Sequence, residues 1–151
     1  MGTFSLIGDD TIQIGARILS DFGSGEIAKV TFPTELATVK TGKNGNTIYI
    51  LNSSGFQASM ELKVIRGSAD DKFIQSLVTS YRSNPTGFVL QTVAIVKKIG
   101  DGSGKTGSDN YTMVGGVPTK NVEIIVNVEA DTDQALSVYT WVFAGSDRAL
   151  V

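Results

Sequence analysis

The clearest limit on the fold of this chain comes from positions 56–66, where apolar and polar residues alternate from Phe56 to Val64. One set of positions is apolar: Phe56, Ala58, Met60, Leu62 and Val64. The positions between them are polar: Gln57, Ser59, Glu61 and Lys63. Successive side chains of a strand point to opposite faces of a sheet, so this pattern predicts a half-buried strand, apolar inside and polar outside.

A helical period occurs in one segment. Apolar side chains form a single stripe at Phe73, Ile74, Leu77, Val78 and Tyr81. Ser68 is a suitable N-cap, and the acidic pair 70–71 falls in the first turn, where carboxylates complement the helix dipole. The Asn-Pro pair at 84–85 ends the helical pattern. We therefore expect a helix over 69–82, and we attribute the acidic pair to its N-terminus.

The rest of the chain favours strands. We expect them at 11–14, 17–19, 26–32, 35–40, 47–51, 88–99, 111–114, 120–129 and 135–143, with a glycine-rich loop over 100–110. The strands at 88–99 and 135–143 are apolar on both faces, which predicts cover on both sides. This succession of strands with one helix, and without a linker, predicts a single domain over 1–151. Its expected fold is mainly β, an antiparallel β-sandwich or barrel with one flanking α-helix.

Two of these strands flank the segment 41–46, whose residues are Thr41, Gly42, Lys43, Asn44, Gly45 and Asn46. The pair Asn44-Gly45 is typical of a type I′ turn, in which both central residues have positive φ. The segment therefore predicts a long hairpin with a tight tip.

Composition excludes several kinds of chemistry. The chain has 151 residues, no cysteine and no histidine, which excludes disulfides, histidine-dependent triads and the usual zinc sites. Its net charge of −2 gives no overall attraction to nucleic acid. Only 19% of the residues are charged, which is typical of surfaces that are buried against other chains. We expect no catalytic residues, no metal site and no cofactor.

The remaining motifs have simpler explanations. The run 100–106 resembles a phosphate-binding loop, but Ile99 occupies the position where that loop needs its first glycine. The residues after it do not predict the helix that would hold a phosphate. Tyr139 and Trp141 could stack a sugar, although aromatic pairs on such a strand more often pack in the core. Other acidic residues occur in turn-like segments: Asp9, Asp10, Glu129, Asp131 and Asp133.

The order of elements resembles that of the tail tube proteins of contractile-tailed bacteriophages. The resemblance lies in a Gly-x-x-Gly hairpin tip, a Ser/Gly break, an Ala-x-Met-x-Leu-x-Val strand and a Gly-Ser-x-x-Asp opening to the helix. In this sequence these are Gly42–Gly45, Ser53–Gly55, Ala58–Val64 and Gly67–Asp71. A Tyr-x-x-x-Gly-Gly-Val-Pro segment at 111–118 and Tyr-Thr-Trp at 139–141 extend it toward the C-terminus.

The resemblance implies a structural role without catalysis. Six copies would join sheets edge to edge into a ring, and rings would stack into a hollow tube. The implied partners are further copies of the chain, a sheath protein, a tape measure protein, and baseplate and tail terminator proteins. Double-stranded DNA would pass through the tube without specific binding, and the tube would belong to a virion assembled in the host cytoplasm.

Within such a tube, we expect one polar sheet face to line the channel. Its candidate residues are Gln57, Ser59, Glu61, Lys63, Glu123 and Asn127. Lys63 could pair with Glu61 across a subunit junction. The hairpin segment 41–46 is expected to reach an adjacent subunit or ring.

Three alternatives remain open. The chain could form the inner tube of a pyocin or of a type VI-like secretion device, because these share the fold. It could be a monomeric β-sandwich module that binds a glycan or peptide, in which case Tyr139 or Trp141 should be exposed. An enzyme would require a carboxylate arrangement that the sequence does not reveal.

Overall fold

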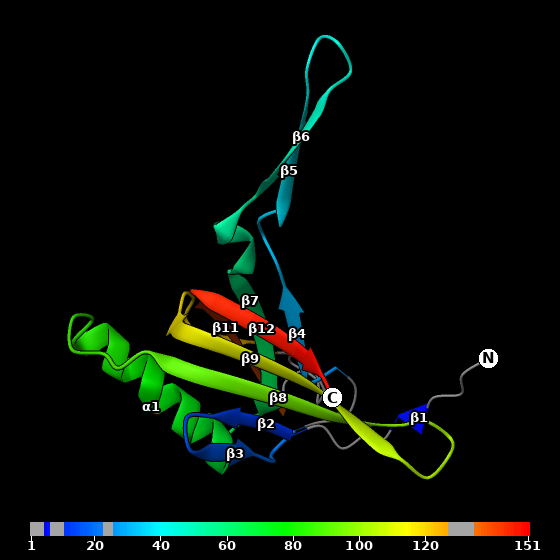
Figure 1. The fold of residues 1–151 in the computed structure, drawn as a ribbon. Coiled ribbons are helices and arrows are strands. Elements are labelled where there is room, and N and C mark those ends of the chain that lie inside the picture. The colour runs from blue at the N-terminus through cyan, green and yellow to red at the C-terminus, as the bar shows by residue number, and fades with distance from the viewer. Residues whose placement is uncertain (1–4, 7–10, 23–25, 127–134) are drawn as a thin grey trace.

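The computed structural model describes residues 5–6, 11–22, 26–126 and 135–151. Over these residues the fold is mainly antiparallel β-sheet with one flanking α-helix, which confirms the predicted class (Figure 1). The elements are β1 (Ser5–Leu6), β2 (Thr11–Ile14), β3 (Arg17–Leu19), β4 (Ala28–Thr31), β5 (Ala37–Thr41), β6 (Thr47–Leu51), the 3₁₀ turn η1 (Ser53–Phe56), β7 (Ala58–Ile65), α1 (Ala69–Ser83), β8 (Gln91–Gly100), β9 (Thr106–Pro118), β10 (Glu123–Ile124), β11 (Leu136–Phe143) and β12 (Gly145–Leu150).

Strand β9 joins two sections of sheet. Its first part pairs with β8 and β12, and its last two residues, Val117 and Pro118, pair with β11. Along the whole path the order is β3-β2-β8-β9-β11-β7-β4. Gly115 has φ +70°, and a Cβ on Gly116 would lie 2.4 Å from the Phe143 ring. Glycine at these positions lets the strand bend closely over the core.

The core lies between the two sheet sections and α1. The predicted inward positions of β7 are confirmed, because Ala58, Met60, Leu62 and Val64 are fully buried. Phe56 is an exception: it belongs to η1 and is 41% exposed. The other core side chains are Ile12, Ile14, Leu19, Ile74, Val78, Val93, Met113, Tyr139, Trp141 and Phe143.

The helix was well predicted. Helix α1 begins after Ser68, whose Oγ accepts a hydrogen bond from the Asp71 N–H at 3.2 Å. Ile74 and Val78 of the apolar stripe are buried against the sheet. The helix ends at Ser83, and Asn84 N–H donates to the Ser80 carbonyl at 3.1 Å.

Two strand predictions and the predicted loop 100–110 were wrong in extent. Within the described part of the expected strand 120–129, which ends at residue 126, only β10 is a strand, and Ile125 and Val126 are exposed beyond it. The expected short strand 111–114 is the centre of the 13-residue β9, and the loop before β9 is only 101–105. Residues 106–110 look like a loop because they are polar, but their backbone groups pair with both β8 and β12. The pairing with β8 is a local hairpin across the turn 101–105, whereas the pairing with β12 brings in a distant segment, Ala149–Leu150.

Cover on both faces of the strands at 88–99 and 135–143 was also expected. In β8 only Val93 is buried, and Val89 and Leu90, which precede the strand, are exposed. Strand β11 is central in the sheet, but its second face is only half-buried. It was expected to be the last strand, yet β12 follows it and pairs with β9. β12 carries exposed charges and lacks the alternation that marks a half-buried strand.

Candidate functional site

The most distinctive surface is the hairpin of β5 and β6, which projects away from the rest of the molecule (Figure 1). The two strands pair with each other, from Ala37 opposite Leu51 to Thr41 opposite Thr47, and with no other strand in the described part of the chain. An isolated two-stranded hairpin is marginally stable in water. The hairpin is therefore a segment that gains from contact with another surface.

The tip differs from the predicted turn type. Gly45 N–H donates to the Gly42 carbonyl at 3.0 Å, and Gly42 N–H donates to the Asn46 carbonyl at 2.7 Å. Gly45 has φ +83°, but Asn44 does not have positive φ, so the turn is not type I′. The tip is instead a three-residue loop in which glycine takes the left-handed position. The predicted hairpin is correct, and the pair that indicated it adopts a different turn.

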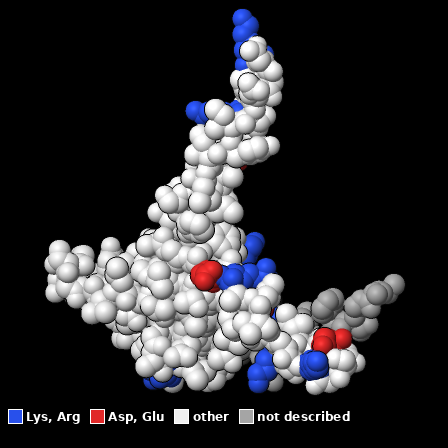
Figure 2. All heavy atoms as spheres, viewed as in Figure 1, with Lys and Arg blue, Asp and Glu red and all other residues white. Residues whose placement is uncertain are grey.

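Both faces of the hairpin carry exposed apolar side chains. On one face Val39 lies opposite Tyr49, which is 75% exposed. On the other face Ile48, 61% exposed, lies opposite Lys40. Figure 2 shows that the charged atoms visible on the upper part of this hairpin are basic. No acidic residue occurs between Glu35 and Glu61, so the hairpin is apolar with a positive tip.

The base of the hairpin is held firmly. The Asn52 amide donates to the Glu35 carbonyl at 3.1 Å and to Thr38 Oγ1 at 2.8 Å. Asn52 N–H also donates to the Leu36 carbonyl at 2.8 Å. A Cβ on Gly55 would lie 2.7 Å from the Leu36 Cα, so only glycine fits there. These contacts fix the direction in which the hairpin leaves the body.

A second surface is the polar face of β7 and its neighbours, where the structure brings together four of the six residues predicted to line a channel. Ser59, Glu61 and Lys63 alternate along β7 on the face away from the core. Glu123 of β10 lies opposite Val138 of β11, which lies opposite Lys63. Directly paired residues share a face, so Glu123 belongs to this polar face. Gln57 precedes β7 as the residue after η1, and Asn127 lies outside the described residues.

Sequence reasoning missed Lys29 on the same face. Lys29 of β4 lies directly opposite Glu61. Its membership depends on a strand pairing 32 positions apart, which no local pattern reveals. The Nζ of Lys63 lies 4.0 Å from Glu61 Oε1 within one chain, so this pair does not need the subunit junction that the sequence analysis offered as one possibility.

The polar face ends at two strand edges. On the outer side of β4, and likewise of β10, no other described strand is paired. The apolar side chains of Ile124, in β10, and of Ile125 and Val126, which follow it, are exposed. Unpaired strand edges present free N–H and C=O groups that can bind another chain.

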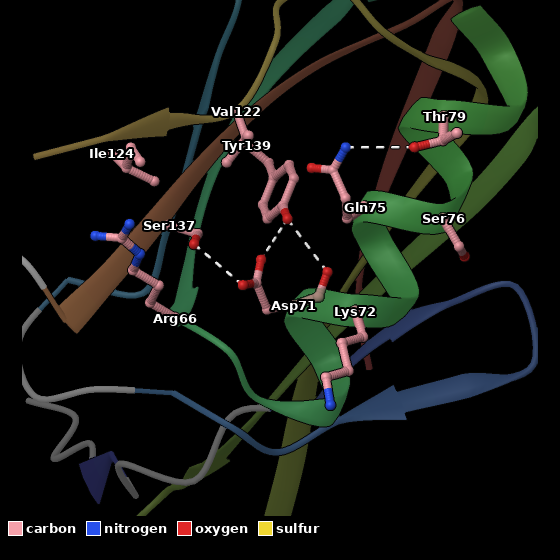
Figure 3. Close-up of a pocket in the computed structure, with 10 residues that line it drawn as sticks. All are labelled: Arg66, Asp71, Lys72, Gln75, Ser76, Thr79, Val122, Ile124, Ser137 and Tyr139. Carbon is pink, nitrogen blue, oxygen red and sulfur yellow. Dashed lines mark hydrogen bonds between the residues drawn. The ribbon is translucent and has the colours of Figure 1, made fainter. Parts of the chain in front are cut away.

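A groove of about 540 Å³ lies between α1 and the β10–β11 region (Figure 3). At its floor the carboxylate of Asp71 accepts hydrogen bonds from the Tyr139 hydroxyl and, at 3.3 Å, from Ser137 Oγ. Gly67 N–H also donates to this carboxylate at 2.8 Å. Burial and the contact with Asp71 raise the pKa of Tyr139 well above its usual value. Because this carboxylate already has three donors, we interpret it as fastening α1 to β11.

Asp70, the other half of the acidic pair, is 1% exposed. Its carboxylate accepts from Ser20 N–H at 2.6 Å, Asp21 N–H at 2.7 Å and Arg17 Nε at 2.9 Å. Burial opposes its ionisation, but the two N–H groups and Arg17 outweigh it and lower the pKa of Asp70. Its role therefore exceeds the helix-dipole contact that the sequence indicated.

The other motifs that fall within the described residues form no reactive arrangement. Residues 101–105 form the turn between β8 and β9, and a strand follows where a phosphate loop needs a helix. Ser103 holds the pKa of Asp101 below its usual value through two hydrogen bonds in this turn. The acidic residues 9–10 and 129–133 lie outside the described residues. Tyr139 and Trp141 are each 1% exposed, so neither offers a stacking surface.

Among the described residues, no cluster of three potential metal-ligating side chains occurs. Within the same residues, no helix has the length and apolar character needed to cross a membrane. Comparison with protein-family models finds none that matches the chain, and comparison with curated proteins also finds no match.

Proposed function

We propose that this chain is a structural subunit of a bacteriophage tail tube, which assembles as stacked hexameric rings. The single observation that carries the proposal is the projecting β5–β6 hairpin. It exposes Val39, Ile48 and Tyr49 to solvent and pairs with no other described strand. Such a hairpin gains stability when a second copy covers it, because burial of apolar surface is favourable.

Pairing between the free sheet edges of neighbouring copies could form the ring. The strands β10, β11, β7 and β4 alternate in direction, so β4 of one copy and β10 of the next would also be antiparallel. Edge-to-edge joining would extend the same hydrogen-bond ladder around a ring, and closure would remove the free edges. The polar face with Ser59, Glu61, Lys63 and Glu123 would then line the channel.

The mixed charge of that face suits passage of DNA. A cluster of basic side chains would bind phosphates by releasing counterions and would hold the DNA. Here Glu61 and Glu123 are interspersed with Lys29 and Lys63, so the described part of this face carries no basic patch. The tape measure protein and DNA would pass without specific contacts, and a sheath would meet the outer surface.

The two alternative functions require different surfaces. The inner tube of a pyocin or type VI-like device would use the same surfaces. A monomeric glycan- or peptide-binding module would instead need an exposed binding surface. The sequence suggested Tyr139 and Trp141 for that surface, and their burial argues against this role.

Electron microscopy of the concentrated, purified protein tests the proposal. We expect rings or hollow tubes of uniform width in negative stain, and a matching high-mass species in sedimentation. Dispersed monomers at every salt and protein concentration would contradict the proposal and favour the binding module.

A further inference from the structure

The charges on the polar sheet face alternate from one edge to the other. Lys29 lies on the β4 edge, Glu61 and Lys63 on β7, and Glu123 on the β10 edge. The face therefore ends in a cation at one free edge and in an anion at the other. Lys29 and Glu123 are both exposed, and neither forms an ion pair with another described residue.

We propose that Lys29 of one copy pairs with Glu123 of the next copy and sets the register of the junction between subunits. This inference rests on the proposed function, because it requires the β4 and β10 edges to meet. The occupant of each edge is a second copy of this chain. The evidence for that occupant is charge complementarity, together with the exposed Ile124, Ile125 and Val126 beside the β10 edge.

The register of the strands permits this contact. Glu123 is aligned across the sheet with Lys63, through Val138 of β11. Lys29 is aligned with Glu61, which lies two residues from Lys63 along β7. A stagger of two residues between copies would bring the two side chains together. An even stagger keeps every side chain on its own face, and closing a sheet into a barrel requires a stagger.

The contact is directional. Each copy offers its cation at one edge and its anion at the other, so copies join head to tail. Head-to-tail joining generates a ring when the rotation closes. Two like edges would instead bring Lys29 to Lys29 or Glu123 to Glu123, and like charges directly opposite are destabilising.

Cysteine cross-linking tests the proposal. The chain has no cysteine of its own, so every disulfide must come from an introduced residue. Lys29→Cys and Glu123→Cys variants would be purified separately, reduced, mixed, assembled and then mildly oxidised. We expect a disulfide-linked dimer in the mixture and little from either variant alone. A chain with both substitutions should give a ladder that ends at the ring size.

The matched control is a mixture of Lys63→Cys with Glu123→Cys. Lys63 is on the same face but one strand further from the junction, beyond the Cα separation that a disulfide spans. Equal cross-linking in this control would overturn the proposal, as would a dimer formed by Lys29→Cys alone.

Neutral variants provide a measurement that does not depend on a disulfide. Lys29→Gln and Glu123→Gln should each raise the protein concentration needed for assembly by about two- to fivefold, and the double variant should be no worse than either. If the wild-type protein forms no rings or tubes, the proposed function fails. If it assembles and neither the cross-link nor the charge effect appears, only this inference fails.

Discussion

The guanidinium of Arg17 lies 2.9 Å from the buried carboxylate of Asp70, and this ion pair joins β3 to the first turn of α1. The Asp70 side chain is 1% exposed, while that of Arg17 is 38% exposed. Two backbone N–H groups, from Ser20 and Asp21, complete the shell of donors around the carboxylate. The chain that follows β3 is thereby fixed against the helix.

Removing the cation should destabilise the subunit. Arg17→Met leaves the Asp70 carboxylate buried with two of its donors but without its counter-charge. We expect a loss of about 3 kcal/mol in the free energy of unfolding, measured by urea denaturation. Arg148→Met is the control, because its ion pair with Asp109 is more exposed and should cost about 1 kcal/mol or less. Equal losses in the free energy of unfolding for the two variants would mean that burial of Asp70 does not increase the cost of removing its cation.

Acid should weaken the subunit partly through Asp70. The pKa of this carboxyl is lowered in the folded state, so its stabilising contribution is fully present above the unfolded value of about 3.9. That contribution is lost as the pH falls through the lower folded pKa. We expect the stability difference between wild type and Asp70→Asn to be constant near neutral pH and to shrink below about pH 4. A difference that is independent of pH down to 2 would contradict this assignment.

Loss of the Tyr139 hydroxyl should loosen α1. Tyr139→Phe keeps the ring in the core and removes the hydrogen bond to Asp71. We expect a destabilisation of about 1.5–3 kcal/mol, because the acceptor is a carboxylate. Tyr49→Phe is the matched control, since Tyr49 is on the exposed hairpin and should leave thermal unfolding unchanged.

The hairpin should matter for assembly and not for folding. Deleting Gly42–Gly45 removes the tip, far from the core residues. We expect the variant to keep the melting temperature of the dispersed wild-type subunit and to fail to form tubes in negative stain. Tubes of normal length and width would show that the tip has no part in assembly.

Local sequence patterns predicted β7 and α1 well, and they predicted the hairpin and the polar face in part. The alternation over 56–66 placed four buried side chains of β7 correctly, and the Ser68 cap located α1 to within one residue. The hairpin was located, although Asn44 does not adopt the expected positive φ. Lys29 was missed because it joins the polar face only through the pairing of β4 with β7.

Features that depend on residues a few positions apart were predictable from the amino-acid order alone. These are the faces of β7, the stripe and cap of α1, and the exclusion of histidine and cysteine chemistry. The length of β9, the existence of β12 and the pairing of Asp70 with Arg17, 53 positions away, depend on contacts in the folded chain. Hydrophobic periodicity and helix capping depend on residues close together in sequence. Strand pairing and charge burial depend on which distant segments pack together.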